Sequence, residues 1–174
     1  MKKIIVFVLF GLIVAACQQQ KEEPKSSPQL PSGPILAQDT LKLAQEAVRA
    51  DPKNVNAWIQ LGNMLMDASR FNEAVDAYQK ALEIDPKNVD VRVDMGTCYR
   101  NSGKPDIAVK EFRKALEINP NHPYGHLNLA VVLAGDFKDK TQAIKEFEKY
   151  LQVAPNATNA EQVRQEIQKL KTAR

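Results

Sequence analysis

The segment Tyr78-Gln-Lys-Ala-Leu-Glu-Ile-Asp-Pro86 returns as Phe112-Arg-Lys-Ala-Leu-Glu-Ile-Asn-Pro120 and, more loosely, as Phe147-Glu-Lys-Tyr-Leu-Gln-Val-Ala-Pro155. The closing prolines, counted from Pro52, are spaced 34, 34 and 35 residues apart. Proline cannot continue a helix and disfavours helical geometry in the residue before it, so each copy predicts a helix that ends at its proline. A fixed period of this length indicates a repeated supersecondary unit.

A second helix is predicted in front of each of these segments. Trp58, Leu61, Gly62 and Leu65 lie at i, i+3, i+4 and i+7, which places them on one face of a helix. Glycine inside a helix costs about 1 kcal/mol relative to alanine, so Gly62 must allow a close helix approach that repays this cost. We expect Gly96 to do the same in the next copy, with Ala74 and Ala108 as the small residues that face the two glycines.

This pattern resembles the tetratricopeptide repeat, a 34-residue helix–turn–helix with W-x2-L-G-x2-Y in its first helix, followed by A-x3-F and P. The matching residues are Trp58, Leu61, Gly62, Ala74, Tyr78, Ala81 and Pro86 in repeat 55–88, Met95, Gly96, Tyr99, Ala108, Phe112, Ala115 and Pro120 in repeat 89–122, and Leu129, Ala143, Phe147 and Pro155 in repeat 123–157. Arg92 and His126 replace the tryptophan, Ala130 replaces a glycine and Tyr150 replaces an alanine. The turns inside the repeats are predicted at 69–70, 101–103 and 135–139, and the third has one extra residue. The resemblance implies an all-α fold, a right-handed α-solenoid of three repeats.

Both flanks of the repeats are predicted to be helical. Residues 36–54 match a lone second helix, with Ala44 and Ala47 at the positions of Tyr78 and Ala81. Residues 158–174 place Ala160, Val163, Ile167 and Leu170 on one face and polar side chains elsewhere, which is the pattern of a capping helix at an open end. We therefore expect eight helices and no strand.

The first 16 residues have the composition of a targeting sequence. Lys2 and Lys3 precede thirteen residues, 4–16, without a charge or a polar side chain. A membrane-spanning helix needs roughly 20 such residues, whereas this length fits the centre of a secretory signal. An uncleaved N-terminal helix or a secreted protein with a chance cysteine is the alternative.

Val14-Ala15-Ala16-Cys17 resembles the lipobox of bacterial lipoproteins. The resemblance implies a signal peptide at 1–16, lipid on Cys17 as the only covalent group, and a location in the bacterial envelope. Gln18 in place of aspartate implies the outer membrane, facing the periplasm, if the source is Gram-negative. Residues 17–35 contain four prolines with glutamine, serine and glycine, a composition that predicts a Pro/Gln-rich tether.

The sequence offers little material for catalysis or cofactor binding. The net charge of +3 includes the two signal lysines and is too small to predict nucleic-acid binding. No phosphate loop, zinc-type cysteine pairing or haem-attachment motif is present, and no catalytic triad is evident. We expect no enzyme, no small-molecule substrate and no cofactor apart from the lipid, and we interpret Cys98 as a buried thiol.

Two histidines define a competing hypothesis. His122 and His126 are spaced i, i+4 and could reach one metal ion. Alternatively, His122 belongs to the turn between repeats and His126 fills the tryptophan packing position. We prefer this second interpretation and predict no metal site.

The resemblance implies that the first helices line a concave groove that binds a protein or peptide partner. The matching positions are Asn56, Ile59, Asn63, Met66 and Asp67, then Asp90, Val93, Thr97, Arg100 and Asn101, then Tyr124, Leu127, Val131 and Ala134. The helix at 123–135 is apolar almost all round, and either burial or partner binding would explain it. The carboxylate clamp of chaperone adaptors is not expected, because Ile59 and Asp94 replace a lysine and an asparagine.

The predicted function is a non-catalytic scaffold, anchored to the membrane by Cys17, that serves the assembly of an envelope complex such as a pilus or a secretion channel. A periplasmic factor that holds apocytochrome during cytochrome c maturation is the alternative within the same class. A metal-binding protein that uses His122 and His126 is the alternative from another class.

Overall fold

The computed structural model describes residues 34–172, which form eight helices and no strand. The helices are α1 (Pro34–Ala50), α2 (Val55–Asp67), α3 (Phe71–Ile84), α4 (Val89–Asn101), α5 (Pro105–Ile118), α6 (Pro123–Gly135), α7 (Lys140–Val153) and α8 (Ala160–Thr172). The all-α prediction is confirmed for these residues. The predicted signal peptide, Cys17 and almost all of the tether lie outside the described residues.

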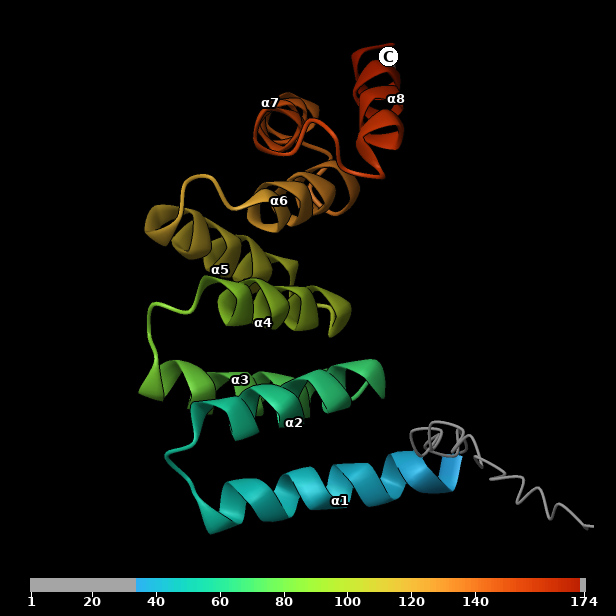
Figure 1. Cartoon of the computed structure of the whole chain (residues 1–174). Helices are drawn as coiled ribbons and strands as arrows, with labels where there is room; N and C mark the ends of the chain where they lie inside the picture. Colours follow the sequence, from blue (N-terminus) through green and yellow to red (C-terminus); the bar gives the residue numbers. More distant parts are fainter. Residues whose placement is uncertain (1–33, 173–174) are drawn as a thin grey trace, which may run out of the picture. The chain divides into compact units, whose positions relative to one another are not determined.

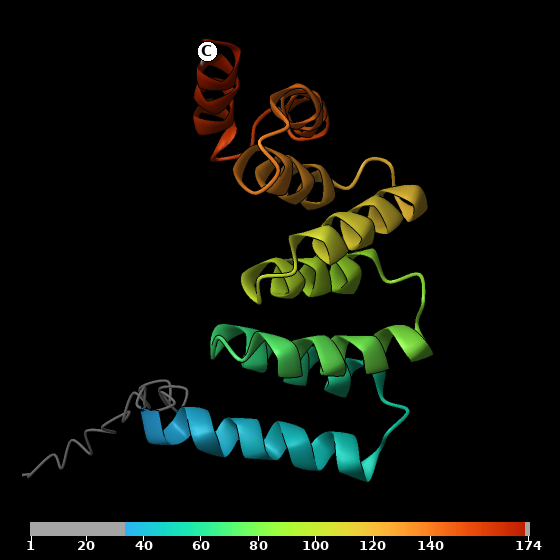
Figure 2. The same ribbon diagram turned by 180° about the vertical axis from the view of Figure 1, so that it is seen from behind.

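Each helix packs against the next one along the chain, and α4 also contacts α6. Figures 1 and 2 show this succession from α1 to α8. The pairs α2/α3, α4/α5 and α6/α7 are the three repeats, and α1 and α8 flank them. Among the described helices, none is both long and apolar enough to cross a bilayer.

Each of the three turns inside the repeats contains one residue with a positive φ. Ser69 (φ 58°), Gly103 (φ 77°) and Lys138 (φ 56°) have left-handed geometry where the first helix of each repeat gives way to the second. A residue of this geometry commonly ends a helix, and glycine adopts it without steric cost. The turns that the sequence placed at 69–70, 101–103 and 135–139 are confirmed.

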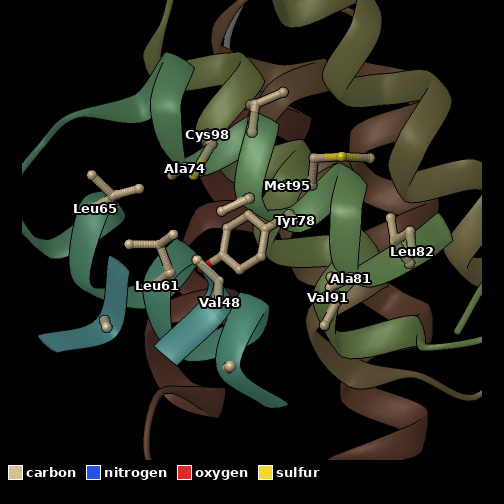
Figure 3. Close-up of a cluster of buried hydrophobic side chains, with 14 residues drawn as sticks. Val48, Leu61, Leu65, Ala74, Tyr78, Ala81, Leu82, Val91, Met95 and Cys98 are labelled. Carbon is tan, nitrogen blue, oxygen red and sulfur yellow. The ribbon is translucent and has the colours of Figure 1, made fainter. Parts of the chain in front are cut away.

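The core of the first repeat is organised around the ring of Tyr78, which is fully buried (Figure 3). A Cβ atom on Gly62 would lie 2.5 Å from Tyr78 Cε1, so only glycine lets the ring lie against α2. In the second repeat, a Cβ on Gly96 would lie 2.6 Å from Phe112 Cε1. The partner nearest to each glycine is therefore an aromatic ring.

The sequence interpretation assigned that role to Ala74 and Ala108. Both alanines are fully buried, but the atoms closest to the glycine positions belong to the rings. The two matched positions of α1 differ in burial. Ala44 is buried, like Tyr78 at the matching position, whereas Ala47 is exposed although the matching Ala81 is buried. Helix α1 packs mainly against α2, while α3 is packed between α2 and α4.

One hydrogen bond recurs at the start of every repeat. Trp58 Nε1 donates to the carbonyl oxygen of Pro52 over 2.9 Å. Arg92 Nη2 donates to Pro86 O over 3.0 Å, and His126 Nε2 is 2.8 Å from Pro120 O. The two residues that replace tryptophan in the later repeats thus keep its role as a donor to the carbonyl of the preceding proline.

The donors that replace tryptophan are each accompanied by a carboxylate on the second helix of the same repeat. Arg92 Nη1 lies 2.8 Å from Glu111 Oε2, and His126 Nδ1 lies 2.6 Å from Glu146 Oε2. In the first repeat, Ala77 stands 19 residues after Trp58, the separation that also joins Arg92 to Glu111. A neutral pair in repeat one corresponds to charged or polar pairs in repeats two and three.

We predict that the pair Arg92/Glu111 can be exchanged for the first-repeat pair. Arg92→Ala should lower the free energy of unfolding by about 3 kcal/mol, because it leaves a buried carboxylate without its main partner. The double variant Arg92→Trp/Glu111→Ala should recover stability to within about 1 kcal/mol of the parent, since the buried Arg92 Nε has no acceptor among the described residues and indole leaves no such group.

Urea unfolding of the parent, the single variant and the double variant measures the effect. A double variant that is as unstable as Arg92→Ala would show that the two pairs are not equivalent.

Candidate functional site

The predicted binding residues all lie on the first helices of the repeats, on a surface of α2, α4 and α6 that we call the first-helix face. Asn56, Asn63, Asp67, Asp90, Asn101 and Tyr124 are exposed, whereas Ile59, Thr97, Arg100, Leu127 and Val131 are half-buried. Val93, which the sequence also placed in the groove, is buried in the core. Its assignment to the binding surface is therefore wrong.

Three polar contacts join α4 to α6 or to the residues at its ends. His122 Nε2 is 2.8 Å from Asp90 Oδ1, and Asn128 Nδ2 donates to Thr97 Oγ1 over 3.2 Å. Arg100 Nε donates to Asp136 Oδ2 over 2.7 Å, just beyond the end of α6. These contacts occupy three of the predicted site residues with partners inside the protein.

The α2 part of the first-helix face is different. Asn63 Oδ1 accepts a hydrogen bond from the hydroxyl of the buried Tyr78 over 2.7 Å, which orients the exposed amide and leaves its NH₂ group without a hydrogen-bond partner among the described residues. Asn56 and Asp67 are exposed and make no side-chain hydrogen bond with any other described residue. The structure thus presents one oriented amide beside two unengaged polar side chains.

The apolar helix α6 is mostly part of the core. Leu129, Ala130, Val132 and Leu133 are buried. On its remaining side, Leu127, Val131 and Ala134 are half-buried and pack against the same cluster as Val163 and Ile167 of α8. Burial is therefore the correct alternative for this helix, and its exposed apolar contribution is Tyr124, 61% exposed.

Asp94 is a half-buried carboxyl group on α4, one turn after Asp90. Burial, and then repulsion from Asp90, raise the pKa of Asp94 to about 6, while the nearby His122 acts in the opposite direction. Asp94 therefore changes between its neutral and its ionised form near pH 6, which is within the pH range of many cellular compartments. The sequence shows an aspartate at this position, but its burial depends on how the helices pack and cannot be read from the sequence.

All four ring nitrogens of the two histidines have protein partners. His122 Nδ1 accepts from the backbone N–H of Gly125 over 3.0 Å, and its Nε2 contacts Asp90. His126 contacts Pro120 O and Glu146, as described above. Within residues 34–172, no group of three or more His, Cys, Asp or Glu side chains has the geometry of a metal site.

The sequence alone does not show which side chains meet the two histidine rings. The structure brings Asp90 and Glu146 to the rings from α4 and α7, 32 and 20 residues away along the chain. These carboxylates orient the rings. His126 does take the tryptophan position, as the sequence indicated.

Cys98 is fully buried and not in a disulfide. Burial, with a smaller contribution from Asp94, raises the pKa of the Cys98 thiol to about 12. Because the thiolate is the reactive form, this side chain is chemically inert at neutral pH. The interpretation of Cys98 as a buried thiol is confirmed.

A second candidate surface lies between α5 and α7. Two cavities of about 300 and 340 Å³ share Arg113, Leu133 and Gln142 as lining residues. Arg113 Nη2 donates to Gln142 Oε1 over 3.3 Å where the cavities meet, and Phe137, 42% exposed, lines the second cavity. Sequence reasoning missed this surface, although the extra residue and the phenylalanine in the 135–139 turn are a signal that the third repeat departs from the others.

Comparison with protein families agrees with this architecture. Two family models, both described as tetratricopeptide repeat, match residues 65–130 and 38–89. The chain belongs to the tetratricopeptide-repeat family. This family consists of protein-interaction scaffolds and is typically non-catalytic, so the first-helix face and the α5–α7 cavities are candidate sites for protein partners.

Solved structures of MamA share the fold. One aligns with a TM-score of 0.69 and 20% identity over 79% of this chain and 74% of that chain. A second has a TM-score of 0.67 and 18% identity over 77% and 81% of the two chains, and MamA MSR-1 C2 has 0.62 and 23% over 69% and 68%. At these identities the likeness concerns the fold alone. A comparison with curated proteins found no match.

We predict that Asp94→Asn stabilises the protein above pH 7 by about 1 kcal/mol, a fraction of the value for full burial because solvent screens this half-buried group. A carboxyl whose pKa is higher in the folded state than in the unfolded state penalises folding when it ionises. The advantage of asparagine should therefore shrink as the pH falls through about 6 and be small near pH 4.5.

Urea unfolding at pH 7.5 and pH 4.5 measures this difference. Asp76→Asn, at an exposed position on α3, is the matched control and should show no comparable gain. An equal gain at both pH values would contradict the assigned cause.

Proposed function

We propose that this chain is a membrane-anchored scaffold of a bacterial envelope, held by lipid on Cys17, which binds a segment of a partner protein on its first-helix face. The anchor is supported by the sequence Val14-Ala15-Ala16-Cys17 after an apolar run of signal-peptide length. The binding surface is supported by membership of the tetratricopeptide-repeat family and by the side chains on α2.

The observation that carries the binding proposal is the orientation of Asn63. An asparagine amide pairs well with an extended backbone, because it both donates and accepts hydrogen bonds. Here the buried Tyr78 hydroxyl holds Asn63 in place before any ligand arrives, so binding loses less side-chain entropy. Asn56 and Asp67 lie on the same helix and add polar groups without internal partners.

The partner segment is assigned to α2, away from the contacts between α4 and the α6 region. The contacts of Asp90, Thr97 and Arg100 with the α6 region would have to be exchanged for contacts with a ligand. Such an exchange gains little, because the hydrogen bonds already exist in the free protein. The unengaged groups on α2 carry no such cost.

The partner belongs to an envelope assembly in this proposal, with a pilus or a secretion channel as the specific setting. If the protein instead holds apocytochrome, the apocytochrome chain would bind on the same first-helix face. The identity of the protein captured by the first-helix face decides between them.

We predict that Asn63→Ala/Asp67→Ala lowers the affinity for the captured partner by at least about tenfold, since two hydrogen bonds to the ligand are each worth roughly 1 kcal/mol. Asp76→Ala makes the same charge change on α3 and should leave the affinity unchanged. The measurement is capture of the partner from envelope extracts, followed by titration calorimetry with the purified pair. Full retention of the partner by the Asn63/Asp67 variant would refute the assignment to α2.

We predict that Cys17→Ser moves the protein from the membrane fraction to the soluble fraction. Without the thiol no lipid can be attached, and two or more acyl chains are what makes such anchoring stable. Fractionation and intact-mass measurement provide the readout. Cys98→Ser is the matched control and should stay in the membrane fraction. A Cys17→Ser variant that remains membrane-bound with unchanged mass would contradict the anchor.

A further inference from the structure

The three first helices begin with the same capping hydrogen bond but not with the same chemistry. Asn54 Oδ1 accepts from the backbone N–H of Ala57, and Asn88 Oδ1 accepts from that of Val91, each over 3.1 Å. At the third start, His122 Nδ1 accepts from Gly125 over 3.0 Å. The capping acceptor of α6 is therefore a titratable ring.

The contacts of His122 define which form of the ring does the capping. Gly125 N–H requires a lone pair on Nδ1, so the proton of the neutral ring is on Nε2, where it is donated to Asp90. A second proton would have to occupy Nδ1. It would then face the Gly125 N–H, and the two donors could not form a hydrogen bond.

We propose that His122 makes the start of α6 sensitive to protonation: the neutral ring caps the helix, and the imidazolium does not. Imidazole is the side chain whose ordinary titration falls between about pH 5 and 8, whereas the asparagine caps of α2 and α4 do not titrate in this range. The proposal is independent of the partner and of the membrane anchor.

The charged and titratable groups around His122 act in both directions. On α4, the Asp90 carboxylate contacts Nε2 and attracts the imidazolium, and Asp94 is close enough to interact with the ring electrostatically. On α6, the free N–H groups of the helix N-terminus repel a positive ring. The ring of Tyr124 is 6.4 Å away, centroid to centroid, and His126, one turn further along, is engaged with Glu146 of α7.

These opposing effects predict a specific outcome for the protonated state. Nε2 keeps its contact with Asp90, because a cation strengthens it, while the cap at Nδ1 is lost. The first turn of α6 then opens more often. Because this turn carries the exposed Tyr124 and lies beside the Asp90 end of the α4–α6 contacts, acidification alters one end of the first-helix face.

The test follows the Gly125 amide and the His122 ring together. In the ¹⁵N-labelled full chain between pH 8 and 5, the Gly125 amide signal should shift with the midpoint of the His122 ring signals. Its hydrogen exchange, corrected for intrinsic pH dependence, should become about tenfold faster, as loss of a cap implies. Repeating the titration with Asp94→Asn removes the neighbouring carboxyl group as a source of the change.

His122→Asn is the matched variant, because asparagine is the cap of the other two first helices. It should fold, retain protection of the Gly125 amide and show no such titration. A Gly125 amide that stays unchanged while the ring titrates, or that titrates equally in His122→Asn, would overturn the proposal. A ring that remains neutral down to pH 5 would overturn it as well.

Discussion

In the first two repeats, the contact between an aromatic ring on the second helix and a glycine on the first helix sets the spacing between the two helices. At Gly62 and Gly96, an added Cβ would lie 2.5 and 2.6 Å from the rings of Tyr78 and Phe112. The rings can be buried only because the glycines lack that atom, and burial of a large aromatic side chain is among the largest contributions to a core of this size. The Tyr78 hydroxyl then reaches Asn63, so the same packing contact positions a polar group on the first-helix face.

A second constraint operates where repeats meet. Carbonyl groups at a helix end have no partner within the helix, and a proline carbonyl near such an end needs a donor from elsewhere. Trp58, Arg92 and His126 each provide it, although they differ in size and charge. The half-buried Arg92 and the buried His126 pair with Glu111 and Glu146, as expected when an unpaired polar group in the interior would be costly.

The α2 part of the first-helix face differs from the α4–α6 part because different side chains reach it. Repeats two and three are joined by contacts of Asp90, Thr97 and Arg100 with the α6 region, so residues that occupy binding positions have become structural there. The first repeat lacks these contacts, and its exposed Asn56 and Asp67 make no side-chain hydrogen bond with any other described residue. Equivalent positions in a repeat protein can therefore serve different purposes, depending on the neighbour that reaches them.

The sequence by itself determined the helices, their pairing and their turns. Prolines, glycines and apolar spacing act within one or two turns of a helix, so the period of 34 residues was enough to predict eight helices, the turn positions and a buried Cys98. Only the tertiary structure decided the partners of the polar side chains. Arg100 meets Asp136 and His126 meets Glu146 across 36 and 20 residues, and periodicity does not encode which side chains face each other between helices. The burial of Asp94 and the capping by His122 depend on that same interhelical geometry, which is why neither could be read from the repeat pattern.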